Sequence, residues 1–443
     1  MTLFDKVGPR IRIWSQAKEL AAKTPESRNR YVDFLRAVSI LVVITGHWLI
    51  AAYAYDAGEL YFSDVLVVQP RVQWLTWLFQ VMPIFFIVGG YANAVSLESA
   101  RSRKTLYAAW LATRLNRLVT PLLALLTGWA AIAAVMHFSG FSGDVIQLAS
   151  RASLIPIWFL AIYIMVVVLA PATHKAWRRW GFASFWLTAA LGVLIDVAFF
   201  AADLRWLGWS NYFWVWLSVH QLGYAWRSER LGGRGRLLVY SLLAFLVLVV
   251  LVHKGPYPLA MVGSPDEDLS NSLPPKISLL VLGIVQLGLL LAIEAPMRRV
   301  LEGLRVWTAT VLINSMIMTV YLWHLTAAMG VVAALYFAGG FGLGLVPTTP
   351  EWWLSRPLWI ACLYAVLLPF TLLLSPLERR SRAVDAPVPA AWRQVGGAVA
   401  ICLGVALIGK FGFGNAPLAG LDIMAFLLVV TGAAISGVLP GFK

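Results

Sequence analysis

Apolar stretches near 20 residues recur along the whole 443-residue chain. Each is long enough to cross a hydrocarbon core of about 30 Å at a helical rise of about 1.5 Å per residue. Runs such as 237–252 are continuously apolar rather than alternating, which excludes a β-barrel. The composition agrees, because 60% hydrophobic residues, 13% charged residues and a mean hydropathy of +0.77 lie outside the globular range. We therefore predict an all-α, polytopic integral membrane protein.

The apolar pattern divides the chain into three parts. Residues 1–30 form a basic segment, 31–380 a ten-helix transmembrane core, and 381–443 a linker followed by a C-terminal transmembrane hairpin. The first apolar run lacks a small-residue cleavage site, so we expect it to remain as an uncleaved first helix. The predicted spans are 32–54, 73–97, 117–137, 156–172, 182–202, 210–227, 236–253, 276–294, 307–336 and 357–376 in the core, and 394–411 and 420–439 in the hairpin.

The charges between the spans predict the orientation. With the N-terminus in the cytoplasm, 26 Lys and Arg residues fall on the inner side and 7 on the outer side. This asymmetry and the attraction of anionic lipid headgroups account for the net charge of +14. We therefore expect the lipid bilayer as a partner and no nucleic acid, since the basic residues are spread over six inner segments.

Two further features limit the chemistry. Cys362 and Cys402 lie inside apolar spans, so neither a disulfide framework nor a thiolate metal site is expected. We predict no metal and no bound cofactor. The outer loop 253–276 is long, with five prolines and three acids, and it suits either a functional loop or a plain connector.

Ionisable side chains inside spans are costly and indicate function. In the first span, Asp33, Arg36 and His47 share one helical face at about 100° per residue. His47 lies about 16 Å beyond Arg36, so Asp33 and Arg36 belong to the cytoplasmic end and His47 to mid-membrane. A packed core histidine is the alternative for His47.

His324 in the ninth span lies at a depth comparable to that of His47, so the two rings could meet. A catalytic role and a polar bridge between helices are equally compatible with its position. At the cytoplasmic start of the third span, Arg114 and Arg117 lie on one side at i, i+3. With Arg36 they form either a phosphate site or ordinary positive-inside anchors.

Several motifs occur in an order that resembles the membrane-bound acyltransferase 3 family, over residues 28–380. They are the run RYVDFLRAVS at 30–39 with His47 at Arg-x10-His spacing, Phe85-Phe86, Arg114 with Arg117, Trp158-Phe159-Leu160 and Tyr321-Leu-Trp-His324. The segment from Tyr257 to Pro275 resembles the actinobacterial branch.

The resemblance implies an enzyme that takes an acyl group from cytoplasmic acyl-CoA, its donor substrate. The acceptor would be a hydroxyl of an envelope carbohydrate or glycolipid on the far side of a bacterial cytoplasmic (inner) membrane. By the same resemblance His47 is the catalytic histidine, with His324 as a second candidate. Donor-binding residues would be Asp33, Arg36, Arg114 and Arg117, and acceptor-side residues Trp158, Tyr163, Tyr321 and Tyr257.

Two departures from the family pattern affect the acceptor side. Gly89-Gly90 follows the Phe pair where relatives often carry Ser-Gly, and Ile162 and Tyr163 occupy the place of an acid. Two routes also stay open, since His47 could carry the acyl group or act as general base. A proton-coupled transporter or flippase of a glycolipid or small molecule is the competing class, although the intraspan acids Asp33, Asp196 and Glu294 all lie near span ends.

Overall fold

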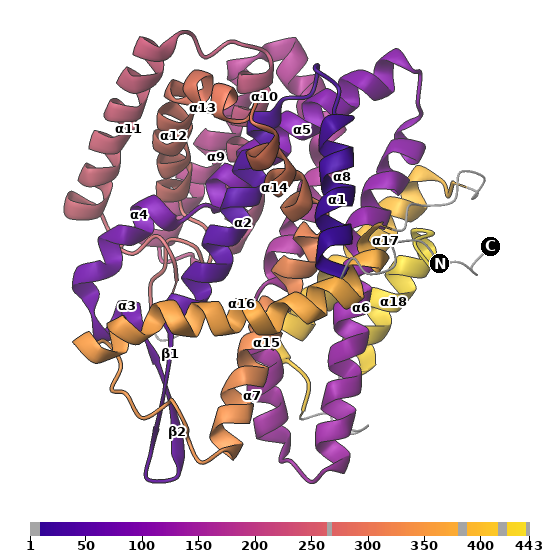
Figure 1. The fold of residues 1–443 in the computed structure, drawn as a ribbon. Coiled ribbons are helices and arrows are strands. Elements are labelled where there is room, and N and C mark those ends of the chain that lie inside the picture. The colour runs from indigo at the N-terminus through magenta and orange to yellow at the C-terminus, as the bar shows by residue number, and fades with distance from the viewer. Residues whose placement is uncertain (1–8, 264–267, 380–387, 415–422, 440–443) are drawn as a thin grey trace, which may run out of the picture.

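The computed structural model describes residues 9–263, 268–379, 388–414 and 423–439 as a bundle of helices (Figure 1). The first half contains α1 Pro9–Ala22, α2 Arg30–Ile50, β1 Ala51–Asp56, β2 Glu59–Asp64, α3 Val65–Val68, η2 Pro70–Leu75, α4 Thr76–Phe79, α5 Met82–Ser102, α6 Tyr107–Phe138, α7 Gly143–Leu154, α8 Ile157–Trp180 and α9 Phe182–Ala201. The second half contains η3 Arg205–Ser210, α10 Asn211–Arg227, α11 Arg234–Lys254, α12 Ile277–Ala292, α13 Glu294–Val300, α14 Leu304–Asn314, α15 Ile317–Phe337, α16 Pro350–Arg379, α17 Ala391–Phe411 and α18 Ile423–Ile435.

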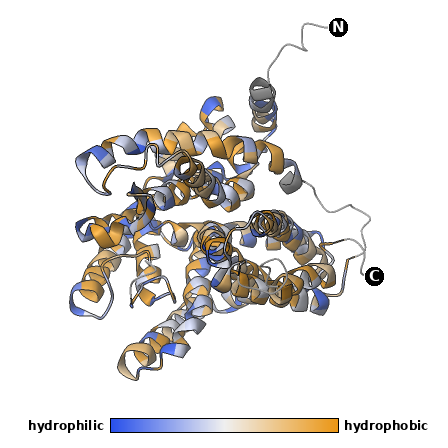
Figure 2. Cartoon of the chain, turned by 90° about the horizontal axis from the view of Figure 1, so that it is seen from below, coloured by the Kyte–Doolittle hydropathy of each residue, from blue (hydrophilic) through white to orange (hydrophobic). Residues whose placement is uncertain are grey.

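The predicted fold class is confirmed. Within the described residues nine helices are long and apolar enough to cross a membrane, and ten if the bent pair α12–α13 counts as one span. Apolar residues run along most of these helices, with hydrophilic residues mainly toward their ends (Figure 2). Helices that are apolar on most sides are expected where the surroundings are lipid rather than water.

The first span is shorter than predicted, because its last residues belong to a β-hairpin. Strand β1 pairs with β2 in antiparallel register, with Tyr53 opposite Phe62. The two-residue turn consists of Ala57 and Gly58, both at positive φ (50° and 95°), as hairpin turns of this length favour. The alternation of Ala and Tyr in β1 has the strand period of two, and hydropathy alone does not separate it from the preceding helix.

Two predicted spans, 73–97 and 307–336, are broken. In the first, η2 and α4 precede α5. Pro83 lies in the first turn of α5, where the missing N–H of a proline costs no helical hydrogen bond. In the second, the chain breaks between α14 and α15, where Asn314 and Ser315 bond to carbonyls of the preceding turn. The span 276–294 likewise bends by 56° between α12 and α13.

Other bounds differ because hydropathy underestimates helices that carry charges. Helix α6 starts at Tyr107, ten residues before the predicted 117, so Arg114 and Arg117 lie inside the helix rather than at its start. Long basic side chains can extend to the surface from within a span. Helix α7, in a predicted outer loop, and α1, in the basic N-terminal segment, were not expected as helices.

Glycines set the closest helix contact in the core, between α5 and α10. A Cβ atom on Gly90 would lie 1.9 Å from the His220 carbonyl oxygen, and one on Gly223 would lie 2.1 Å from the Ile87 oxygen. Backbones can approach this closely only where side chains are absent. Of the Gly89-Gly90 pair that departs from the family pattern, Gly90 is therefore part of this helix interface, whereas Gly89 lies against the Tyr163 side chain of α8.

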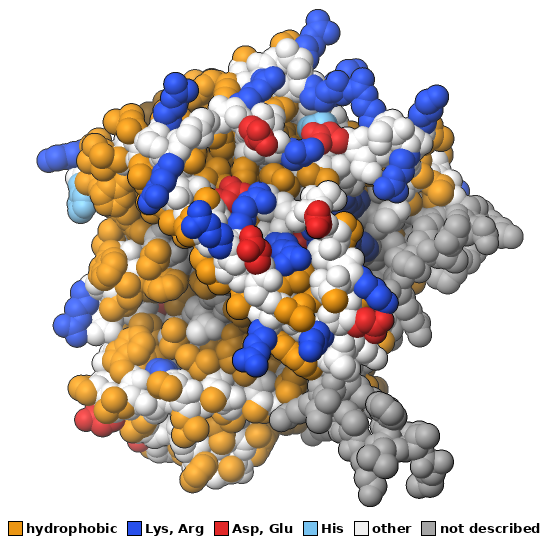
Figure 3. All heavy atoms as spheres, turned by 45° about the horizontal axis from the view of Figure 1, so that its top comes forward, with side chains coloured by type: hydrophobic (Ala, Val, Ile, Leu, Met, Phe, Trp, Pro, Cys, Tyr) orange, Lys and Arg blue, Asp and Glu red, His pale blue; other side chains and the backbone are white. Residues whose placement is uncertain are grey.

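The bundle has two ends of different character. Lys and Arg side chains gather over the end that carries α1, at the top of Figure 1, which we name the basic face (Figure 3). The opposite end carries β1 and β2, and we name it the hairpin face. Helix α2 runs from the basic face to the hairpin face, as does α15.

Candidate active site

His47 of α2 and His324 of α15 meet inside the bundle, as their comparable depths suggested. Nδ1 of His47 lies 2.9 Å from Nε2 of His324, and the two rings stack with centroids 5.2 Å apart. His324 is fully buried, whereas residue His47 is partly exposed. The accessible member of the pair is therefore His47.

The hydrogen bonds of the pair assign the tautomer of each neutral ring. Nδ1 of His324 lies 2.5 Å from the carbonyl oxygen of Tyr321, and a carbonyl can only accept, so this nitrogen carries the proton. Nε2 of His324 is then an acceptor, and Nδ1 of His47 donates to it. Consequently Nε2 of His47 keeps its lone pair, and no described residue donates to it.

Neighbouring side chains hold this arrangement in place. Nε1 of Trp48 donates to the His324 carbonyl oxygen at 3.1 Å, and the Trp48 ring packs edge-on against Tyr364 at 4.8 Å. Tyr364 in turn shares a hydrogen bond of 2.9 Å with Thr45 of α2. These contacts join α2, α15 and α16 around the histidine pair.

The aromatic motifs converge on the same region. Phe159 of α8 packs edge-on against Phe85 and Phe86 of α5, at 4.9 and 5.4 Å, and against Tyr321 at 5.6 Å. The Tyr321 ring lies 5.9 Å from His324, and its hydroxyl donates to the Pro156 oxygen. Motifs from three distant segments thus form one wall beside the histidines.

The other predicted acceptor-side residues lie at different distances from this wall. Tyr163 belongs to it, stacking on Phe159 at 5.7 Å, whereas Trp158 packs against Tyr212 at 6.0 Å. Tyr257 is not brought to the histidines, because its hydroxyl donates to Asp196 at 3.0 Å and anchors loop 253–276. This anchoring favours the connector interpretation of that loop.

Asp196, which the sequence identified only as an acid near the end of a span, is the centre of that anchor. Its carboxylate accepts from Tyr257, from Asn211 at 2.8 Å and from the Ile277 backbone N–H at 2.8 Å. Lys276, fully buried just before α12, lies 3.8 Å from the centre of the Phe199 ring. Burial lowers the pKa of Lys276 to about 8, against the opposing attraction of Asp196.

A cavity of about 640 Å³ opens at the basic face and contains all four predicted donor-binding residues: Asp33, Arg36, Arg114 and Arg117. Three further arginines line it, Arg28, Arg103 and Arg227. We name it the basic cavity. Its walls come from α2, α5, α6 and the end of α10, and its lining includes neither His47 nor His324.

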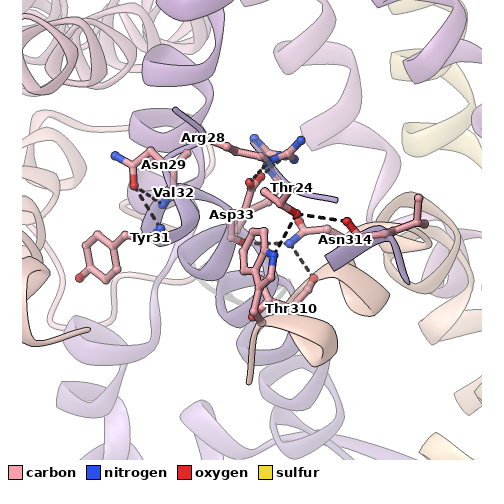
Figure 4. Close-up of polar contacts among 11 residues, drawn as sticks. Thr24, Arg28, Asn29, Tyr31, Val32, Asp33, Thr310 and Asn314 are labelled. Carbon is pink, nitrogen blue, oxygen red and sulfur yellow. Dashed lines mark hydrogen bonds and ion pairs between the residues drawn. The ribbon is translucent and has the colours of Figure 1, made fainter. Parts of the chain in front are cut away.

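Asp33 is held by two arginines at the start of α2. Its carboxylate accepts from Arg28 Nε at 2.6 Å and from Arg36 Nη1 at 3.5 Å, the latter at i, i+3 on the same helix. The shorter of these hydrogen bonds raises the pKa of Arg28. Asn29 caps α2 by accepting from the Tyr31 and Val32 backbone N–H groups, and so turns Arg28 back over the helix start (Figure 4).

The bond from Arg28 leaves most of the Arg36 guanidinium free to face the basic cavity. Asn314 donates to the Asp33 backbone oxygen at 2.8 Å and fixes the same turn from α14 (Figure 4). Arg114 is held over the Trp110 ring with its guanidinium carbon 5.6 Å from the ring centre. Several guanidiniums therefore converge on one space, as binding of phosphate groups requires.

The three intraspan acids are all engaged. Asp33 is bonded to Arg28, Asp196 is bonded to Tyr257, and Glu294 accepts from Arg298 at 2.6 Å and from Trp226 at 3.2 Å. A proton-coupled carrier needs a carboxylate that can load and release a proton along its path. Each of these three carboxylates instead accepts hydrogen bonds from neighbouring protein groups.

Comparison with known proteins agrees with the site. A family model described as an acyltransferase domain, Acyl_transf_3, matches residues 29–375, which is more than half of the chain. The match includes both histidines and every arginine of the basic cavity except Arg28, which lies one residue before it. The assignment to the actinobacterial branch stays a prediction. Searches of curated proteins and of solved structures found no match. The chain therefore belongs to the acyltransferase 3 family and is a membrane-spanning acyltransferase.

Proposed function

We propose that this protein is an O-acyltransferase that uses acyl-CoA as donor and a hydroxyl of an envelope carbohydrate or glycolipid as acceptor. The observation that carries the proposal is the pair His47–His324, in which Nε2 of His47 keeps an unshared lone pair. The basic face would lie in the cytoplasm and the hairpin face outside a bacterial cytoplasmic membrane, in keeping with the positive-inside rule.

The basic cavity is the proposed site for the phosphates of acyl-CoA. Arg36, Arg114 and Arg117 would bind them, because guanidiniums pair with phosphate oxygens through parallel hydrogen bonds. Asp33 would act indirectly, by holding Arg28 and the first turn of α2 in place. His47 lies eleven residues, about 16 Å, along α2 from Arg36, so the thioester must extend toward the centre of the bundle.

In the chemical step, the acceptor oxygen forms a bond to the thioester carbonyl carbon and the carbon–sulfur bond breaks. Nε2 of His47 takes the hydroxyl proton as general base, and the leaving thiolate of CoA receives a proton. The second route places the acyl group on Nε2 first and transfers it to the hydroxyl afterwards. Both routes need the same unprotonated nitrogen.

His324 acts in this proposal as a positioning residue. Its Nε2 accepts a hydrogen bond from Nδ1 of His47, while its own Nδ1 donates to the Tyr321 carbonyl oxygen. These two hydrogen bonds fix the tautomer of His47 that leaves Nε2 unprotonated. An orienting group behind a catalytic histidine is a recurring device in acyl transfer.

The test is acyl transfer by purified protein given acyl-labelled acyl-CoA and a membrane extract as the source of acceptor. His47→Ala should lower the rate of thioester cleavage and transfer by about 10²- to 10⁴-fold, the usual contribution of a general base. His137→Ala, at an exposed position at the end of α6, is the matched control and should keep the wild-type rate. Full activity of His47→Ala in well-folded protein would refute the role of His47.

The transport hypothesis gives a different result in the same assay. A transporter neither cleaves the thioester nor leaves label on an acceptor. If wild-type protein released no free CoA with any acyl-CoA, the proposal of an acyl-CoA-dependent enzyme would fail.

A further inference from the structure

A buried arginine without an acidic partner lies at the start of α16, near the hairpin face. The side chain of Arg356 is 8% exposed, and its Nε donates to the Trp352 oxygen at 3.2 Å. One Nη2 hydrogen is donated to Ser355 Oγ at 3.0 Å. The guanidinium lies between two indoles, 4.1 Å from the centre of the Trp352 ring and 5.3 Å from that of Trp359.

The remaining donors of this cluster have no acceptor among the residues that the structure describes. Two of the five guanidinium N–H groups are used, and no acid of the described residues lies within 4 Å of Arg356. Nε1 of Trp352, a fully buried side chain, also lacks an acceptor among the described residues. A buried charge without a partner is costly, so adjacent free donors indicate a place for an anion.

The cluster adjoins a small space that lies on the hairpin side of the histidines. This space has a volume of about 20 Å³, and Trp48, Tyr53, Met329 and Trp359 help to line it. Trp48 donates to the His324 oxygen on one side of this space. Trp359 lines the space and packs against the Arg356 guanidinium, so it connects the two sites.

We propose that Arg356 and Trp352 bind the phosphate group of a ligand that approaches from the hairpin face. Resting on the proposed function, this ligand is the acceptor, and the acceptor class is then a phosphate-bearing carbohydrate or glycolipid whose hydroxyl points toward His47. The guanidinium supplies the planar pair of N–H groups that phosphate oxygens prefer, and the partly exposed indole of Trp359 offers a flat surface to a sugar ring. The headgroup phosphate of a bilayer lipid is the other source of the same chemistry.

The experiment uses full-length protein labelled with 5-fluorotryptophan and follows the ¹⁹F resonance of Trp352, assigned with Trp352→Phe. In detergent, glucose 1-phosphate should shift this resonance in a saturable manner, whereas glucose should not. Arg356→Gln should abolish the shift, and Arg356→Lys, which keeps the charge but not the planar fork, should weaken binding about 10-fold. Because the probe is local, phosphate bound in the basic cavity does not contribute.

Two controls separate binding from folding. Arg205→Gln removes an exposed arginine, paired with Asp203 at 2.8 Å beside η3, and should leave the titration unchanged. Without phosphate, Arg356→Gln should unfold at the same temperature as wild type or higher, since it removes a buried unpaired charge. Unfolding at a clearly lower temperature would mean that Arg356 is a structural anchor and would overturn the proposal.

Nanodiscs identify the source of the phosphate. A Trp352 shift with glucose 1-phosphate in phosphatidylcholine discs supports an acceptor phosphate. A shift on moving from detergent to these discs, with no further effect of the sugar phosphate, supports the same anion site filled by a lipid headgroup. A resonance that moves in neither case, or moves equally in Arg356→Gln, overturns the proposal. Failure of thioester cleavage in wild type would overturn the proposed function and leave this binding result intact.

Discussion

At the scale of single residues, the site depends on the direction of two hydrogen bonds. The Tyr321 carbonyl oxygen orients His324, and His324 orients His47, so one backbone oxygen determines where the reactive lone pair lies. The proposed donor end depends in the same way on Arg28, which binds Asp33 more closely than Arg36 does and leaves most of the Arg36 guanidinium facing the basic cavity. Each reactive group is thus set by a neighbour that would not itself touch substrate.

Replacements of His324 test its positioning role. His324→Asn keeps a side-chain oxygen that can accept from His47 Nδ1, whereas His324→Ala removes the acceptor. We expect kcat to fall about 10- to 100-fold in His324→Ala and less in His324→Asn, with the KM for acyl-CoA unchanged in both. Equal losses in the two variants, with equal thermal stability, would contradict tautomer control by His324.

The arginine pair of α6 should act on the donor alone. Charged hydrogen bonds contribute about 1.5 to 3 kcal/mol, so Arg114→Ala or Arg117→Ala should raise the KM for acyl-CoA about 10- to 100-fold. Arg305→Ala, at an exposed position on α14 outside the basic cavity, is the control and should keep the wild-type KM. Steady-state kinetics with varied acyl-CoA provide the measurement, and an unchanged KM in both α6 variants would exclude phosphate binding by this pair.

At the scale of elements, the contact of α5 with α10 holds the aromatic wall in place. Gly90→Ala places a methyl group where the His220 carbonyl oxygen lies 1.9 Å away, so the helices must separate. We expect a loss of about 1 to 3 kcal/mol in stability, as for other overpacked cores, seen as a lower unfolding temperature in detergent. Gly235→Ala on α11, with nothing within 4 Å of the added carbon, should be neutral or slightly stabilising. Equal stability of the two variants would show that α5 and α10 tolerate separation.

The sequence predicts the elements well where hydropathy alone decides them. Spans such as 182–202 and 236–253 agree with α9 and α11 to within two residues, because an apolar run and a helix coincide there. Hydropathy cannot distinguish strand β1 from the helix before it, and it cannot show the break at Ser315, which depends on side chains bonding to the backbone. Those features depend on local geometry rather than on average apolarity.

The residues of the candidate site were likewise predictable only in part. His47, Arg36 and Asp33 share a helical face that periodicity makes visible, and comparable depth placed His324 opposite His47. The roles of Arg28 and the Tyr321 carbonyl could not be predicted, because both depend on how separate helices turn toward each other. A buried arginine among tryptophans at 352–359 is a pattern that a search for intraspan charges could have found.

At the scale of the whole molecule, the proposed reaction joins two faces of one bundle. The basic cavity opens at the end that carries α1, over which Lys and Arg side chains gather (Figures 1 and 3). The histidine pair belongs to α2 and α15, which both run from that end to the hairpin face. The donor and the acceptor would therefore arrive from opposite sides. Only the acyl group would pass the plane of the histidines.

The most direct measurement of this arrangement uses proteoliposomes of known protein orientation with labelled acyl-CoA supplied on one side only. We predict thioester cleavage when acyl-CoA is on the side of the basic face, almost none from the hairpin side, and a rate at least about 100-fold lower for His47→Ala. Equal cleavage from both sides by wild type, or cleavage by His47→Ala at the wild-type rate, would contradict this arrangement.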